Sequence, residues 1–178
     1  MARISGIGLE EQLALKIERE LSNQMDDVLF KVQKIAKQFS IQEITEKSPF
    51  KNVLVVAVET PTSLEVIKNF IRYQAGRKQS SEIWKKKSPN EPQKRFADEV
   101  VNHLNSLAEN CKLILDGVES SISEELQLEE ITTLQKDRLQ NLQNYMLKNK
   151  PALLQSVHLR LVQLYLGYLS REHTALLK

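Results

Sequence analysis

The sequence predicts an all-α fold, an irregular bundle of about six helices with long first and last helices and one long basic loop. Apolar residues recur at helical spacing along most of the 178 residues. Glycine and proline number only five each, which suits long helices and disfavours a turn-rich β sandwich. We therefore expect a single helical domain over residues 1–178, with a loop at about 76–95.

The first predicted element is a long amphipathic helix over residues 9–39. Its apolar side chains follow one another in steps of three and four, at Leu9, Leu13, Ile17, Leu21, Met25, Leu29, Val32, Ile35, Ala36 and Phe39. Strict four-residue steps drift around a straight helix, so the stripe should change faces before it resets near Met25. A strut of a bundle is the favoured interpretation, and a helix that reaches past its own domain is the alternative.

The next segment holds the longest apolar run of the chain. Ser40 and Glu43 have capping-box spacing, and Pro49 suits the first position of a helix. Residues 53–58 (VLVVAV) have the composition of a buried strand but also keep helical spacing with Phe50. We favour a helix, because no second convincing strand exists to pair with this run and a lone strand leaves its backbone groups unsatisfied.

A second capped helix precedes the basic loop. Thr62 and Glu65 have capping-box spacing, and Gly76 stands where a left-handed cap would end the helix. Helical periodicity then disappears between residues 76 and 93, and Ser-Pro-Asn-Glu-Pro at 88–92 is typical of turns. Loops of this length in compact domains are usually functional or disordered.

Three further helices are predicted after the loop. The first runs from Phe96 to Ile114 and should stop at Asp116-Gly117. Ser121 and Glu124 then form a third capping box before a long polar helix, which Asn149-Lys150-Pro151 should break. The last helix, from Pro151, carries leucine, valine and tyrosine on more than one face and is the predicted centre of the core.

The sequence contains no catalytic signature. There is no H-E-x-x-H motif and no phosphate-binding glycine motif, and His103, His158 and His173 are widely separated. The single cysteine, Cys111, lies on an apolar helical stripe and is predicted to be a core residue rather than a nucleophile. We expect no catalytic residue, no metal and no cofactor, and therefore no enzyme.

The first residues and the hydropathy of the chain favour a cytoplasmic protein. Near Met1 there is no apolar core of secretory length, and acidic residues follow at once. No stretch approaches ~18 consecutive apolar residues, so no membrane partner is expected. One cysteine allows no intrachain disulfide.

Charge is distributed unevenly along the chain. Residues 72–95 contain two acids and eight cations, which are Arg72, Arg77, Lys78, Lys85, Lys86, Lys87, Lys94 and Arg95. Residues 116–130 contain six acids and no cation. The formal net charge of +2 therefore hides two oppositely charged lobes.

The basic segment 72–95 is the candidate polyanion-binding site. Its cations could neutralise phosphates while Trp84, the one tryptophan, stacks on an unpaired base. Tyr73 also lies within this segment, and Phe96 follows it. Two plainer interpretations stay open: a solvated loop whose aromatic side chains pack against the core, or pairing of the basic lobe with the acidic lobe, within one molecule or between copies.

Residues 62–77 (TSLEVIKNFIRYQAGR) resemble the capped helix of the small all-helical subunits of type III CRISPR effector complexes. The resemblance covers about a tenth of the chain. It implies an antiviral defence protein without a catalytic site, which stacks inside a ribonucleoprotein and touches guide–target RNA through basic side chains.

The leading hypothesis is a non-enzymatic helical subunit of a larger assembly that contacts RNA or another polyanion through residues 72–95. Other protein subunits are its expected partners, and a homo-oligomer is compatible with the pattern. The alternative hypothesis is a helical interaction or adaptor protein that binds only protein.

Overall fold

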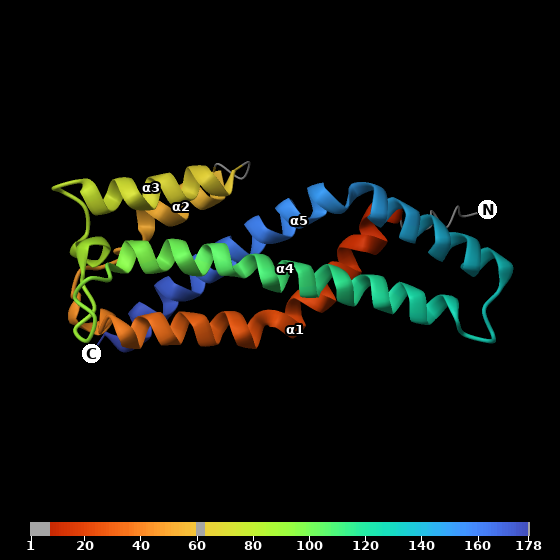
Figure 1. The fold of residues 1–178 in the computed structure, drawn as a ribbon, viewed down its shortest axis with the longest axis horizontal. Helices are drawn as coiled ribbons and strands as arrows, with labels where there is room; N and C mark the ends of the chain where they lie inside the picture. Colours follow the sequence, from red (N-terminus) through yellow and green to blue (C-terminus); the bar gives the residue numbers. More distant parts are fainter. Residues whose placement is uncertain (1–7, 60–62, 178) are drawn as a thin grey trace, which may run out of the picture. The chain divides into compact units, whose positions relative to one another are not determined.

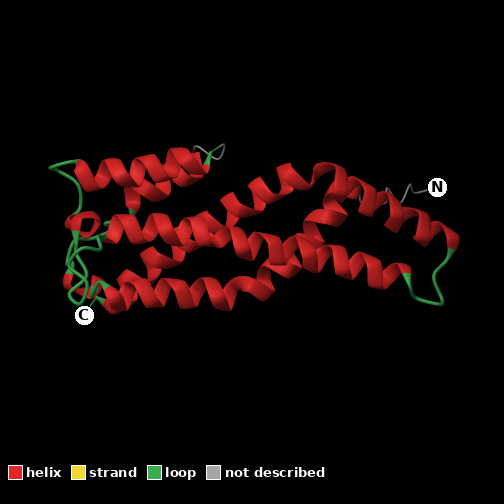
Figure 2. Cartoon of the chain, viewed as in Figure 1, coloured by secondary structure: helices red, strands yellow, loops and turns green. Residues whose placement is uncertain are grey.

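The computed structural model describes residues 8–59 and 63–177, and within these residues the all-α class is confirmed. The described residues form five α-helices, joined by loops and without a strand (Figure 2). The helices are α1 (Leu9–Gln38), α2 (Lys51–Glu59), α3 (Leu64–Gly76), α4 (Phe96–Leu126) and α5 (Thr133–Leu176) (Figure 1). Two short 3₁₀ turns, η1 (Ile41–Glu43) and η2 (Glu82–Lys85), lie in the connections. No helix of the described part is long and apolar enough to cross a membrane.

The chain gathers into two compact units of opposite charge. The acidic unit comprises Met1–Met25 and Glu109–Ser156, with 12 acids and 8 cations, a net of −4. The basic unit comprises Asp26–Ala108 and Val157–Lys178, with 11 acids and 17 cations, a net of +6. Helices α1, α4 and α5 each contribute residues to both units.

An aromatic cluster forms the centre of the basic unit. Phe50 lies edge-on to Trp84, with ring centroids 5.6 Å apart, and Phe39 lies edge-on to Phe96 at 5.4 Å. His173 from α5 also packs edge-on against Phe50, at 5.8 Å. All five side chains are at most 1% exposed. Because these residues come from five separate segments, their packing fixes the connections as well as the helices.

The valine-rich run forms a helix, as predicted. Helix α2 spans Lys51–Glu59 and buries Val53 and Ala57, while Val58 is 65% exposed. Gln163 of α5 donates a hydrogen bond from Nε2 to the carbonyl oxygen of Ala57, at 2.9 Å. A helix satisfies its own backbone groups, so β-branched residues can fold this way where no partner strand exists.

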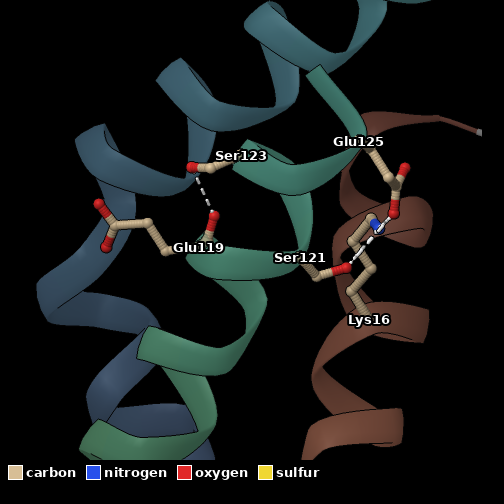
Figure 3. A network of polar contacts seen from close by, with 5 residues as sticks. All are labelled: Lys16, Glu119, Ser121, Ser123 and Glu125. Atoms are coloured by element: carbon tan, nitrogen blue, oxygen red, sulfur yellow. Dashed lines mark hydrogen bonds and ion pairs between the residues drawn. The ribbon is translucent and has the colours of Figure 1, made fainter. Parts of the chain in front are cut away.

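Parts of α1, α4 and α5 form the acidic unit. Apolar side chains build its core, among them Leu13, Leu21, Ile114, Val118, Ile122, Leu142 and Met146. Lys16 of α1 donates to Ser121 Oγ at 3.3 Å and pairs with Glu125 Oε1 at 2.5 Å, both on α4 (Figure 3). The contacts of Lys16 join α1 to α4 within this unit. Ser123 projects from the opposite side of α4 and donates to the carbonyl oxygen of Glu119, within the same helix, at 2.9 Å (Figure 3).

The predicted helix stop at Asp116-Gly117 is wrong, because α4 continues to Leu126. Gly117 does not have a positive φ, and a Cβ at this position would lie 2.7 Å from Glu20 Oε2 of α1. The glycine therefore leaves room for the Glu20 side chain of α1 instead of ending α4. Ser121 binds Lys16 and does not begin a new helix.

The predicted break at Asn149-Lys150-Pro151 is also wrong, because Pro151 lies inside α5. Lys150 pairs with Glu119 at 3.2 Å and Asp116 at 3.8 Å, both on α4. Burial of Leu142 and Met146 on the same helix adds to these ion pairs in holding this part of α5, so the missing N–H does not end the helix. The chain instead breaks at residues 127–132, inside the predicted polar helix. The three helices predicted after the loop are therefore two, and the number of helices is five instead of about six.

The predicted helix caps agree with the structure less closely than the predicted helices do. Ser40 has a left-handed backbone with φ 46° and makes no capping hydrogen bond, and Glu43 pairs with Lys86 instead. Gly76 ends α3 as predicted but without a positive φ. Thr62 lies outside the described residues, so the capping box with Glu65 stays a prediction.

Candidate polyanion-binding surface

The basic segment 72–95 begins on α3 and is held to the basic unit by its own apolar residues. Turn η2 buries Ile83 and Trp84, and Ser81 Oγ accepts a hydrogen bond from the backbone N–H of Ile83 at 3.4 Å. An isolated antiparallel bridge joins Lys87 to Arg95. The backbone N–H of Phe96 donates to the carbonyl oxygen of Lys86 at 2.8 Å. The buried side chains of η2 therefore anchor the predicted loop, and backbone contacts close its second part, residues 86–96.

Trp84 does not offer a stacking surface in this structure. Its side chain is 1% exposed and packs against Phe50 and, with ring centroids 5.7 Å apart, against Phe96. A ring enclosed in this way has no face for a nucleic-acid base. We therefore correct the predicted role: Trp84 anchors the segment, and it leaves the set of candidate ligand-binding residues.

Four of the eight predicted cations are paired with nearby acids. Lys85 pairs with Glu82 at 3.7 Å, Lys86 with Glu43 at 2.6 Å, Lys94 with Glu91 at 2.8 Å, and Arg95 with Asp98 at 2.7 Å. The hydrogen bond to Glu91 raises the pKa of Lys94, and the one to Asp98 raises the pKa of Arg95. These four cations already have counterions, so each would gain less from a phosphate than an unpaired cation.

The other four cations make no ion pair with any described residue. Arg72, Arg77, Lys78 and Lys87 are all exposed. Three of them, Arg72, Arg77 and Lys78, lie within seven residues around the end of α3. Cations that need not first break an existing pair are the strongest candidates for phosphate contacts.

Tyr73 is the exposed aromatic side chain among these cations. It is 54% exposed, and its ring centroid lies 5.9 Å from that of Phe70, one turn earlier on α3. The sequence places Tyr73 between Arg72 and Arg77, but its exposure and the burial of Trp84 depend on how the chain packs. We call Arg72, Tyr73, Arg77 and Lys78 the α3 cationic patch.

The acids of residues 116–130 belong to the acidic unit, where several already have partners. Glu125 pairs with Lys16, and Lys150 pairs with Asp116 and Glu119. Glu124, Glu129 and Glu130 are exposed and make no ion pair with a described residue. The acidic lobe is therefore partly neutralised within its own unit.

The three histidines make structural hydrogen bonds. His158 and His173 donate from Nε2 to the carbonyl oxygens of Leu104 at 2.7 Å and Ile44 at 2.8 Å. His103 Nδ1 lies 2.9 Å from the hydroxyl of Tyr165, and burial lowers the pKa of His103. In the part of the chain that the structure describes, no three His, Cys, Asp or Glu residues are placed to hold a metal ion.

Comparison with known proteins gives no relative: no protein-family model, no curated protein and no solved structure matches this chain.

Proposed function

We propose that this protein is a cytoplasmic, non-enzymatic helical subunit of a larger assembly and that it contacts single-stranded RNA through the α3 cationic patch. The observation that carries the proposal is that the unpaired cations Arg72, Arg77 and Lys78 and the exposed ring of Tyr73 lie within seven residues at the end of α3. Single-stranded nucleic acid is bound by cations that follow the phosphates and by aromatic faces that stack on bases. This patch offers both.

The rest of the basic segment has a supporting role in the proposal. Lys87 adds a fourth unpaired cation, while Lys85, Lys86, Lys94 and Arg95 can exchange their present acids for phosphates. Exposed ion pairs are worth about 0–1 kcal/mol, so this exchange costs little. The paired cations therefore extend the surface around the patch.

The sequence resemblance adds a specific assembly to the proposal. Helix α3 lies within residues 62–77, the stretch that resembles small helical subunits of type III CRISPR effector complexes. On this proposal, the protein is an antiviral defence subunit and the patch faces guide–target RNA. Its other contacts are with protein subunits.

A fluorescence titration of a short unstructured RNA at several salt concentrations tests the RNA contact. Each phosphate contact with a single strand contributes about −0.7 to the log–log slope of affinity against salt. The variant R72A/R77A/K78A should therefore flatten the slope by about two. Tyr73→Ala should weaken binding by about 1–3 kcal/mol with little change in slope, because stacking is not ionic.

The matched control is K85A/K94A/R95A, which removes the same charge from paired positions of the same segment. It should flatten the slope by less than R72A/R77A/K78A does. Equal effects of the two triple variants would contradict the assignment to α3 and leave only a diffuse basic surface. If the wild type binds no RNA at all, the protein-only adaptor becomes the better hypothesis.

A further inference from the structure

A groove lies within the acidic unit, at the connection between α4 and α5. It has a volume of about 630 Å³ and is lined by the end of α4, the connection 127–132, the first turns of α5 and Gln12 of α1. A volume of this size is within the range of pockets that bind ligands, about 300–1,000 Å³. The RNA-binding proposal makes no use of this groove.

Part of the groove lining is apolar. Leu128, Ile131 and Leu139 line it, and Leu128 is 62% exposed. A single exposed leucine is ordinary on a protein surface, but three large apolar side chains in one concave site form a surface that an apolar ligand would cover. The groove therefore favours a ligand that itself has an apolar face.

The lining of the groove also contains acidic side chains. Glu129 and Glu130 line it, are exposed and make no ion pair with a described residue, whereas Arg138 is the one cation in the lining. The two unpaired carboxylates favour a cationic ligand.

The acidic character continues beyond the groove along α4. A neighbouring hollow of about 400 Å³ shares Glu125 and Leu128 with the groove and also contains Glu124. A third hollow, of about 510 Å³, shares Glu124 and adds Asp116 and Glu119. A ligand longer than one pocket would therefore meet further acids along this side of α4.

We propose that this groove binds a basic amphipathic helix of a partner protein. Apolar residues of that helix would cover Leu128, Ile131 and Leu139, and lysines or arginines would pair with Glu129 and Glu130. Charge complementarity selects this partner: a nucleic acid is repelled by the acids, and a small polycation leaves the apolar side chains of the lining uncovered. The proposal rests on the assembly part of the proposed function and is independent of its RNA contact.

The test is fluorescence anisotropy of the full-length protein with a labelled synthetic helix that has leucines on one face and lysines on the other. Leu128→Ala should weaken binding about tenfold, because it removes an apolar side chain that the bound peptide would cover. The variant E129Q/E130Q should weaken binding about fivefold and reduce its salt dependence, because it removes two partly exposed ion pairs. Both variants change exposed residues, and far-ultraviolet circular dichroism should show unchanged helix content.

Matched controls come from α1 of the same unit. Leu15→Ala removes a leucine that is 60% exposed outside the groove, and E11Q/E18Q removes two exposed acids outside it. Both control variants should bind the peptide as the wild type does. R72A/R77A/K78A should also bind it normally, which separates a failure of this proposal from a failure of the RNA contact.

Three outcomes would overturn the proposal. The first is a wild type that does not bind the peptide. The second is equal loss of affinity in the groove variants and their controls. The third is loss in E129Q/E130Q without loss in Leu128→Ala, together with displacement of the peptide by spermine, which would show a nonspecific acidic surface.

Discussion

Cys111 lies on the apolar face of α4 and is 1% exposed. Burial disfavours the thiolate and raises the pKa of Cys111 to about 12. A thiol with this pKa is almost entirely protonated at neutral pH, and the thiolate is the nucleophilic form. The position predicted from the sequence as a core residue therefore has the chemistry of one.

The raised pKa of Cys111 predicts a loss of stability at high pH. Above about pH 9 the thiol ionises in the unfolded chain while the native thiol keeps its proton. Ionisation therefore stabilises the unfolded state relative to the native state. The free energy of unfolding should fall by up to about 1.4 kcal/mol per pH unit above this point. Urea denaturation of the wild type and of Cys111→Ala at several pH values measures the effect as a difference.

The difference isolates Cys111 because other groups titrate equally in both proteins. Tyr165 is one of these: burial also raises the pKa of its hydroxyl, but it is present in the wild type and the variant alike. The advantage of the wild type over Cys111→Ala should shrink between about pH 8 and about pH 10. If the difference in free energy of unfolding between the two proteins stays constant over this range, burial does not raise the pKa of Cys111.

At the residue scale, the candidate site could be predicted only in part. The basic segment is a property of the sequence, since its eight cations are neighbours along the chain. Which cations are neutralised is not, because Lys86 pairs with Glu43, which is 43 residues away. Likewise, tertiary packing buries Trp84, to which base stacking was assigned, and leaves Tyr73 exposed, which the sequence alone does not reveal.

At the element scale, Gly117 of α4 provides a test of the contact with the Glu20 side chain of α1. Alanine favours a helix over glycine by about 0.5–1 kcal/mol. A Cβ at position 117 would lie 2.7 Å from Glu20 Oε2, which is the end of a flexible side chain that also accepts from Asn23. Gly117→Ala should therefore stabilise the protein less than a glycine-to-alanine change without a neighbour, as measured by urea denaturation.

Gly167 of α5 is the matched control, because a Cβ there meets nothing within 4 Å. Gly167→Ala should show the full gain of helix propensity. Adding Glu20→Ala to Gly117→Ala should restore the part that the clash removes. If Gly117→Ala destabilises the protein by more than about 1 kcal/mol, Glu20 is held more firmly than its contacts indicate.

The accuracy of the predicted elements depends on what decides each boundary. Helix α1 follows from apolar spacing, which is local information, whereas the helical state of residues 53–58 was inferred from the lack of a partner strand elsewhere in the chain. The boundaries at Gly117 and Pro151 were wrong because glycine and proline only lower the local stability of a helix, and the burial of nearby side chains such as Val118 and Met146 outweighs that loss. The turn, glycine and proline signals of the sequence therefore located three true connections between helices and two false ones.

At the scale of the whole molecule, three helices pass through both compact units. Because α1, α4 and α5 each run from one unit into the other, unfolding of one unit would leave the other unit with three new helix ends whose backbone groups are unpaired. We expect one cooperative unfolding transition. Trp84 fluorescence reports on the basic unit, and far-ultraviolet circular dichroism reports on all helices, so the two denaturation curves should coincide.

Two separated transitions would contradict this expectation. In that case, the fluorescence of Trp84 would follow only one of the two steps seen by circular dichroism. The predicted single helical domain over residues 1–178 would then be the wrong description of the chain.

The opposite charges of the two units also affect how the protein should be handled. An isoelectric point of about 8.6 averages a unit of net +6 and a unit of net −4, so it describes neither. At neutral pH the basic unit can adsorb to a cation-exchange resin while the acidic unit can adsorb to an anion-exchange resin. Retention in chromatography should therefore follow the charge of the unit that faces the resin, and the isoelectric point is a poor guide to the choice of column.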